Sequence, residues 1–151
     1  MPPQQKDQPK YLFDLYGVIS VLKSGSNQAR NAFISGLASG SVKVMSEVAN
    51  QLKAVDEDLY KEFQAIKSGR VYQPTNIPHS SAQQALMDKF GTGLFGGSPS
   101  PEYFESVAVC KVDNLILVTA DKALTNCKAI TKKCNLASVT VLSIAEFGAE
   151  A

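Results

Sequence analysis

Four carboxylates occupy positions in this sequence that suit a shared binding site. Asp14 lies inside the apolar run YLFDLYGVIS, and Glu47 comes two residues after the short run VKVM. Glu102 opens a helical segment, and Asp121 follows the apolar run LILVT by two residues. Carboxylates held close together repel one another, and a hard divalent cation such as Mg²⁺, which prefers oxygen ligands, relieves that repulsion. The four acids therefore predict a metal site of the magnesium type.

Such a site is suited to the hydrolysis of phosphodiester bonds. One or two bound ions can activate a water molecule and stabilise the oxygen that leaves. In this scheme Asp14 and Asp121 are the principal metal ligands. Glu47 and Glu102 complete the site, directly or through waters. Thr119 is either an ordinary strand residue or a hydroxyl that orients a metal-bound water.

Each acid also has a purely structural interpretation. Asp14 and Asp121 could cap a turn or a helix, which aspartate often does. Glu47 and Glu102 could favour helix N-termini through the helix dipole. Glu105 lies one turn beyond Glu102 on the same helix face, so it is an alternative third acid. A lone charged residue within an apolar run is unusual, and this favours a functional role for Asp14.

The elements that must bring these acids together follow from the hydrophobic pattern. Strands are predicted at 11–16, 42–45, 115–119 and 137–142, and helices at 27–37, 46–52, 56–66, 80–90, 100–111 and 121–133. The first strand is expected to end near Leu15 or Tyr16. Ser46 and Ser100 are predicted helix caps. A Ser/Gly loop (KSGSN), a Pro-rich irregular segment at 71–79, a Gly/Ser loop at 91–100 and a short closing turn at 144–147 complete the chain.

This alternation of strands and helices predicts a three-layer α/β/α fold with a mainly parallel central sheet. The chain has 151 residues, which suits one domain. We expect a flexible N-terminal tail at 1–10 and a single domain at 11–151. Ligands of open parallel sheets bind beyond the carboxyl ends of the strands. Asp14 lies near the end of the first predicted strand, and Glu47 and Asp121 follow the second and third. Glu102 heads the helix that leads to the third, so all four acids are expected to converge on that edge.

The composition excludes several classes of protein. The net charge of +1 argues against binding nucleic acid through bulk positive charge. Cys110, Cys127 and Cys134 have no metal-site spacing and are interpreted as reduced, buried thiols. His79 is the only histidine and is expected at the surface, so a zinc site is not indicated. No apolar run is long enough to span a membrane and the N-terminus resembles no signal peptide, so a cytoplasmic location is expected.

The order and spacing of these parts resemble the PIN-domain family. The members begin with a buried strand ending in Asp, here YLFDLYGVIS, and carry a second acid near a helix start, here VKVMSEVANQL. A third acid opens a helix that leads to a strand of the type "lvT.D", here EYFESVAVCKVDNLILVTADKAL. A closing strand and short helix follow, here ASVTVLSIAEF. The resemblance spans nearly the whole chain after the tail.

The resemblance implies a ribonuclease that depends on Mg²⁺ or Mn²⁺, with Asp14, Glu47, Glu102 and Asp121 as metal ligands and Thr119 as a supporting residue. Many members of the family are toxins of bacterial toxin–antitoxin pairs, so a protein antitoxin and a homodimer are implied as well. The chain departs from the pattern in three respects. Tyr16 stands where many PIN domains have a small polar residue, and the third acid is Glu rather than Asp. The segment from Glu102 to Thr119 is about one residue longer than usual, which keeps Glu105 as a candidate for the third acid.

Two other functions are alternatives to the ribonuclease interpretation. The segment FDLYGV also resembles the first motif of haloacid-dehalogenase-type hydrolases, in which Asp14 would be a nucleophile. A non-catalytic PIN-like module is the other alternative, and the loop GTGLFGGSPS, with Leu94 and Phe95, could contact its partner. Under the ribonuclease interpretation, Lys23 and Lys122 are candidates for holding RNA phosphates, and binding would then depend on salt.

Overall fold

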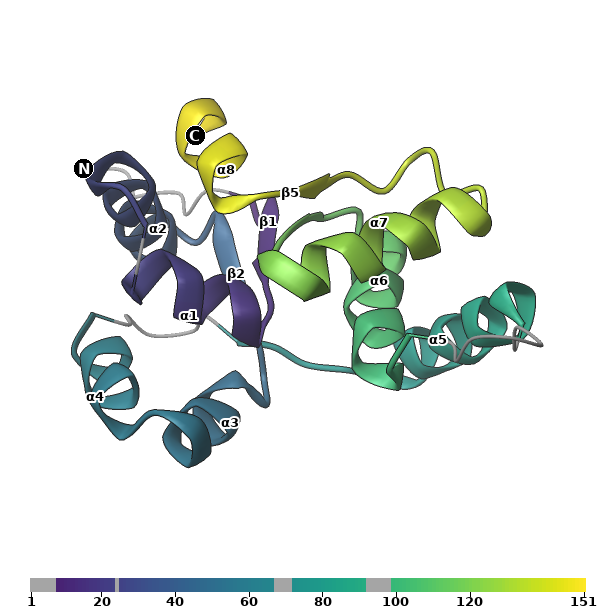
Figure 1. Ribbon diagram of the computed structural model, residues 1–151, viewed down its shortest axis with the longest axis horizontal. Helices are drawn as coiled ribbons and strands as arrows, with labels where there is room; N and C mark the ends of the chain where they lie inside the picture. The colour runs from purple at the N-terminus through teal and green to yellow at the C-terminus, as the bar shows by residue number, and fades with distance from the viewer. Residues whose placement is uncertain (1–7, 24, 67–71, 92–98) are drawn as a thin grey trace, which may run out of the picture.

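The computed structural model describes residues 8–23, 25–66, 72–91 and 99–151. Its strands are β1 (Tyr11–Phe13), β2 (Val42–Met45), β3 (Tyr72–Gln73), β4 (Ile116–Val118) and β5 (Val141–Leu142). They form one parallel sheet with the order β3-β2-β1-β4-β5 (Figure 1). The chain builds outward from β1 to β3 and then crosses to the other side of β1. The strand order therefore reverses between β1 and β4, which is where such sheets bind ligands.

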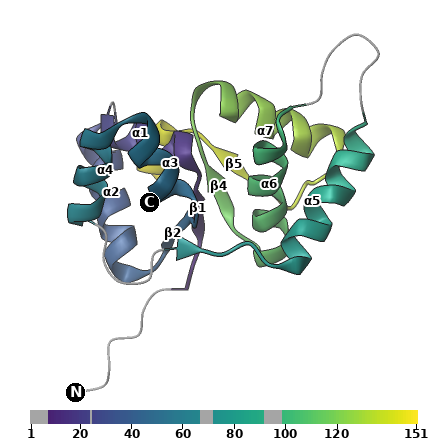
Figure 2. The same cartoon turned by 90° about the horizontal axis from the view of Figure 1, so that it is seen from below.

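Helices cover both faces of the sheet. They are α1 (Leu15–Lys23), α2 (Asn27–Ser39), α3 (Val48–Val55), α4 (Glu57–Ile66), α5 (Ile77–Phe90), α6 (Pro101–Asp113), α7 (Asp121–Lys133) and α8 (Ile144–Glu150). Helices α1 to α4 lie on one side of the strands and α5 to α7 on the other (Figure 2). Helix α8 packs on α2, and α6 packs against α5 and α7. The predicted three-layer α/β/α architecture is confirmed.

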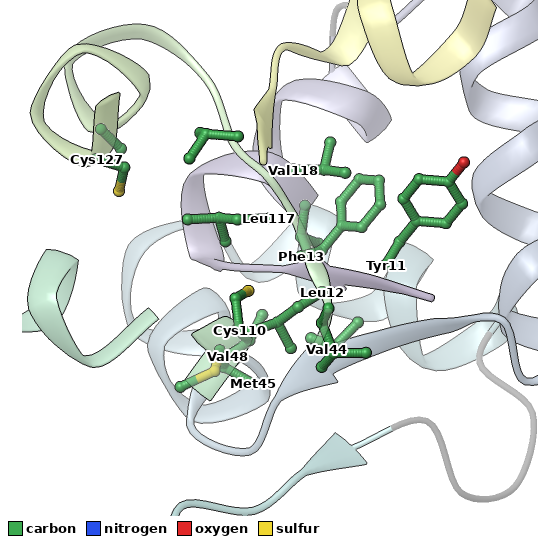
Figure 3. Packing of buried hydrophobic residues seen from close by; sticks show 14 of the residues in the cluster. Tyr11, Leu12, Phe13, Val44, Met45, Val48, Cys110, Leu117, Val118 and Cys127 are labelled. Carbon is green, nitrogen blue, oxygen red and sulfur yellow. The ribbon is translucent and has the colours of Figure 1, made fainter. Parts of the chain in front are cut away.

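The central strand β1 forms the middle of the core. All three of its residues are buried, and Phe13 meets Phe33 of α2 and Phe147 of α8 with ring centroids 4.7 and 4.9 Å apart. Leu12 projects to the opposite face of the sheet, because side chains alternate along a strand. There it lies beside Cys110 of α6 (Figure 3). The burial of both faces fixes the position at which β1 ends.

The predicted end of the first strand, near Leu15 or Tyr16, is wrong. Both residues belong to α1, a helix that the hydrophobic pattern did not indicate. An uninterrupted apolar run does not distinguish a buried strand from a buried helix by periodicity. The change from strand to helix occurs at Asp14, whose carboxylate caps the helix and whose carbonyl accepts the N–H of Val18 at 3.0 Å. The predicted loop therefore shrinks to the few residues between α1 and α2.

Helix α1 starts directly on the end of β4, and Gly17 makes this possible. A Cβ atom at Gly17 would lie 2.5 Å from the backbone oxygen of Val118. No side chain can occupy that space, because the obstacle is backbone and cannot rotate away. The first turn of α1 is thus pressed against the carboxyl end of β4, and this contact brings the end of β1 to the point where the strand order reverses.

The segment 71–79, predicted to be irregular, holds a strand and a helix start. Tyr72 and Gln73 form β3, which pairs with β2, and α5 begins at Ile77 rather than at 80. Ser46 does not cap a helix by its side chain. Its hydroxyl instead donates to the carbonyl of Gln73 at 2.8 Å, so it prolongs the β2–β3 pairing. Glu47 directly precedes α3, which begins at Val48.

Other predicted elements agree more closely with the structure. Strand β2 and helix α7 have the predicted bounds. The predicted closing turn is a helix, α8, which Ser143 caps through the N–H of Glu146. Most of the loop at 91–100, including Leu94 and Phe95, lies outside the described residues, as does most of the predicted N-terminal tail.

The three cysteines are buried, as predicted. Cys110, Cys127 and Cys134 are free thiols in the core. Burial raises the pKa of the Cys110 and Cys127 thiols well above the usual range, so both remain protonated. Among the helices that the structure describes, none is long and apolar enough to cross a membrane.

Candidate functional site

Asp14 is a buried carboxylate at the point where the strand order reverses. Only 5% of its surface is exposed. One oxygen, Oδ1, accepts the N–H of Gly17 at 2.8 Å, and the other, Oδ2, accepts the Thr119 hydroxyl at 2.7 Å. Thr119 follows β4 and is fully buried. Asp14 therefore caps α1, as its structural interpretation required, and is also tied across the sheet to the neighbouring strand.

The ionised form of Asp14 is costly in this position. Burial raises the pKa of its carboxyl from 3.8 to about 6, although the hydrogen bonds from Gly17 and Thr119 lower it. The nearby Glu102 carboxylate raises it further. Among the described residues, no ion pair joins Asp14 to a Lys, Arg or His side chain. A carboxylate held in this way is a ready ligand for a cation, because a positive charge would offset the cost of desolvation.

A small hollow opens beside Asp14 at the carboxyl edge of the sheet. It holds about 60 Å³, which is enough for a few water-sized groups. Four acids from three places in the fold line it: Asp14 after β1, Glu47 before α3, and Glu102 and Glu105 of α6. The rest of the lining is Leu15, Tyr16, Met45, Val48, Gln51, Tyr103 and Ser106. The sequence analysis placed three of these acids together, and Glu105 joins them.

The acids in this hollow repel one another. Burial and the negative charges of Glu47 and Glu102 raise the pKa of the Glu105 carboxyl. Glu47 and Glu102 are exposed, whereas Glu105 is half-buried. Both candidates for the third acid, Glu102 and Glu105, line the same hollow. Glu102 is the more accessible of the two to a ligand that arrives from solvent.

Tyr16 joins this acidic hollow to a second one. Its hydroxyl donates to Glu102 Oε1 at 3.0 Å, and its ring lies 5.9 Å from that of Tyr103. Burial, with hydrogen bonding to Tyr103 and Glu102, raises the pKa of the Tyr16 hydroxyl well above its usual range. The second hollow is lined by Tyr16, Ile19, Ser20, Lys23 and Asp121. Tyr16 is the residue that the two linings share.

Asp121 lines the second hollow and not the acidic one. It is the first residue of α7, yet it does not cap that helix by its side chain. Its φ of 58° is in the left-handed region, which is uncommon for a residue with a Cβ atom. The carboxylate is exposed and shares its hollow with Lys23. The four predicted ligands thus divide into a group of three acids and a separate Asp121.

The donor chemistry of the acidic hollow fits a hard divalent cation. Its charged groups are carboxylates, and their oxygens are the ligands that Mg²⁺ and Mn²⁺ prefer. As the side chains stand, no three His, Cys, Asp or Glu residues in the described parts of the chain are grouped closely enough to hold one ion. A cation in this hollow would therefore be held by few protein oxygens and keep several waters, as Mg²⁺ usually does.

His79 is buried, contrary to the prediction of a surface residue. It is 3% exposed, and its Nδ1 accepts the N–H of Asn76 at 2.8 Å. Because Nδ1 is an acceptor, Nε2 carries the proton and donates to Asp113 Oδ2 at 2.9 Å. Gln73 donates to the same oxygen at 2.7 Å. Asp113 of α6 therefore joins His79 of α5 to Gln73 of β3, and the place of His79 in a Pro-rich segment gave no sign of this.

Solved structures resemble this chain in fold. The crystal structure of PAE2754 from Pyrobaculum aerophilum matches with a TM-score of 0.57 and 13% identity, over 93% of this chain and 88% of that one. The crystal structure of FitAcB from Neisseria gonorrhoeae matches with a TM-score of 0.58 and 16% identity, over 89% of this chain and 98% of that one. No protein-family model and no curated relative matches the sequence.

At these identities the likeness concerns the fold alone. The parallel five-stranded sheet between two helix layers is the PIN-like arrangement that the sequence resemblance predicts. The expected fold class is confirmed.

Proposed function

We propose that this protein is a divalent-metal-dependent ribonuclease of PIN type. One observation carries the proposal: Asp14 is buried, has a raised pKa, and opens onto a hollow with three further carboxylates. A cluster of this kind is unfavourable without a cation and favourable with one. The PIN-like fold supports the assignment, because the acids lie at the carboxyl edge of its sheet.

The reaction would be hydrolysis of an RNA phosphodiester. The oxygen of a water molecule forms a bond to phosphorus, and the bond from phosphorus to one ribose oxygen breaks. The water gives up a proton to a base, and the departing oxygen gains one. A bound Mg²⁺ or Mn²⁺ supplies positive charge that lowers the pKa of water and stabilises the departing oxygen.

The residues have distinct roles in this proposal. Asp14 is the inner ligand, held in one orientation by Gly17 and by the Thr119 hydroxyl. Glu47 and Glu102 line the same hollow and complete the site directly or through waters. Asp121, in the neighbouring hollow, would face the RNA on the other side of Tyr16.

Two measurements test the proposal together. The first is cleavage of a labelled single-stranded RNA pool with Mn²⁺, with and without a chelator. The second is Mn²⁺ binding by calorimetry. Both compare the wild type with Asp14→Asn, which preserves the size and can preserve the hydrogen bonds of the side chain. Asp58→Asn is the matched control, since Asp58 is an exposed acid in the first turn of α4.

We expect cleavage and Mn²⁺ binding in the wild type and the control, and neither in Asp14→Asn. Equal cleavage by wild type and Asp14→Asn would contradict the proposal. Binding of Mn²⁺ without cleavage would favour the non-catalytic alternative. A covalent adduct on Asp14 after incubation with a phosphate ester would favour the haloacid-dehalogenase type.

The resemblance to PIN-domain toxins extends the proposal to partners. We propose a protein antitoxin that covers the carboxyl edge of the sheet, a homodimer in solution, and a cytoplasmic location. Light scattering of the purified protein tests the dimer. Suppression of RNA cleavage by a co-expressed protein from the same operon tests the antitoxin, and a monomer that no such protein inhibits would overturn this extension.

A further inference from the structure

Tyr16 is the bulkiest difference between this site and the PIN pattern, and it is engaged with the acids. Its hydroxyl donates to Glu102 Oε1 at 3.0 Å, and the two residues are 86 positions apart in the chain. Tyr16 belongs to the first turn of α1, directly after Asp14 and Leu15, while Glu102 belongs to the first turn of α6. The bond therefore connects the two helix layers across the mouth of the acidic hollow.

Glu102 depends on this contact for its orientation. It is an exposed side chain at a helix start, and without a partner it would sample several rotamers. The hydroxyl of Tyr16 fixes one carboxylate oxygen, Oε1, and none of the described residues makes a hydrogen bond to Oε2. A ligating carboxylate is commonly held in this way, by a donor on one oxygen while the other faces the metal.

Tyr16 itself is held firmly enough to serve as that donor. Gly17 locks the first turn of α1 against β4, and Tyr103 packs against the Tyr16 ring. These contacts keep the Tyr16 hydroxyl within hydrogen-bonding distance of Glu102 Oε1, at 3.0 Å.

We infer that Tyr16 is a positioning residue, whose hydroxyl orients Glu102 as a ligand for the divalent cation in the acidic hollow. This inference rests on the proposed function, since it assigns a role toward the metal of that site. Tyr16 occupies the position at which the PIN pattern has a small polar residue. In this inference it replaces that residue and acts through Glu102. Tyr16 also lines both the acidic hollow and the hollow that includes Asp121.

The test is a double-mutant cycle on Mn²⁺ affinity, measured by calorimetry. The variants are Tyr16→Phe, which removes the hydroxyl alone, Glu102→Gln, and the two combined. Tyr60→Phe is the matched control, because Tyr60 is a half-buried tyrosine on α4 whose ring lies under Lys53, away from the acids. Urea unfolding of each variant reports whether the fold is retained.

We expect Tyr16→Phe to weaken Mn²⁺ binding by about tenfold to a hundredfold, the usual effect of losing an outer partner of a metal ligand. Tyr60→Phe should bind as the wild type does. In the Glu102→Gln background, Tyr16→Phe should have no further effect, because the hydroxyl acts through that carboxylate. A destabilised fold alone would not produce this loss of additivity.

Three results would overturn the inference. Unchanged affinity in Tyr16→Phe would show that the hydroxyl does not position a ligand. Tighter binding would show that the hydrogen bond holds Glu102 away from the ion. Additive losses in the double variant would show that Tyr16 acts by another route. If the wild type binds Mn²⁺ and Asp14→Asn does not, these results leave the proposed function intact; a wild type that binds no Mn²⁺ overturns both.

Discussion

The hydroxyl of Thr119 donates to the carboxylate of Asp14 at 2.7 Å, across the point at which the strand order of the sheet reverses. Both side chains are buried, so this bond forms away from bulk water. The bond holds Asp14, which lines the acidic hollow, in one orientation and lowers the pKa of its carboxyl.

The free energy of unfolding should depend on pH through Asp14. Its pKa is about 6 in the folded protein and near 3.9 in an unfolded chain, so between these values the folded state binds more protons. Stability from this group must then fall as pH rises from about 4 to about 6, by about 3 kcal/mol, and stay level above. Asp14→Asn should therefore be more stable than wild type near pH 8 and about equally stable near pH 4. Urea unfolding at the two pH values measures this. An equal difference in the free energy of unfolding between Asp14→Asn and wild type at both pH values would contradict the prediction.

Thr119→Val should remove one hydrogen bond to Asp14 with little change in volume. Losing a bond to a buried charge typically costs about 1.5–3 kcal/mol, so the variant should be less stable by that order near pH 8. The loss also raises the pKa of Asp14 further, so the pH at which Mn²⁺ binding begins should move upward. Calorimetry across pH reports the shift. In an Asp14→Asn background the destabilisation should shrink, and an unchanged cost there would contradict the account.

Gly17→Ala should disturb the start of α1. The new methyl group would meet the Val118 backbone oxygen at 2.5 Å, and the helix must move away from β4. Overpacking of this kind usually costs about 1–3 kcal/mol. Because Asp14 caps the same turn, Mn²⁺ affinity should fall with stability. A variant with wild-type stability in urea and wild-type Mn²⁺ affinity would show that this contact is not tight.

His79→Leu should affect the fold but not the metal. The substitution leaves the N–H of Asn76 and the carboxylate of Asp113 without their partner, and we expect a loss of about 2 kcal/mol in the free energy of unfolding. The acidic hollow does not include His79. Mn²⁺ affinity, measured at a temperature where the variant is folded, should therefore stay within about twofold of wild type, and a large loss would place His79 in the site.

Lys23→Gln should weaken RNA binding uniformly across sequences. Lys23 shares a hollow with Asp121 and Tyr16, next to the acidic hollow, where a phosphate flanking the cleaved bond could reach it. Removing one phosphate contact reduces the slope of affinity against salt by about one. Lys61→Gln, on the outer part of α4, is the control. Fluorescence anisotropy measures RNA affinity at several salt concentrations, with both variants made in an Asp14→Asn background to prevent cleavage. Equal slopes of affinity against salt for the two variants would show that Lys23 does not contact the RNA.

The sequence contained enough information to predict the fold class and much of the acidic hollow. Apolar runs of strand length that alternate with helical spacing determine a parallel sheet, and the acids that follow those strands must lie at its carboxyl edge. Asp14 and Glu47 were placed on this basis. Glu105 was only an alternative to Glu102, because helical spacing alone does not decide which of two neighbouring acids faces a hollow.

The remaining differences have physical causes that a single sequence does not reveal. Helix α1 was missed because it is apolar on several sides and follows a strand without a polar break. Strand β3 is two residues long and exists through its pairing with β2, which is a tertiary interaction. Asp121 was expected to share a site with Asp14, Glu47 and Glu102; it lines a neighbouring hollow, and Tyr16 lines both.

The strand order has a consequence for the newly made chain. Asp14 leaves the ribosome early, but the hydroxyl that holds it belongs to Thr119, 105 positions later. Glu102 and the whole of β4 also come late in synthesis, while domains fold as units once their parts are available. A nascent chain that ends before β4 therefore has its first acid but no assembled hollow. If the protein cleaves RNA, the order of its strands keeps the growing chain inactive until the segment from Glu102 to Thr119 has been synthesised.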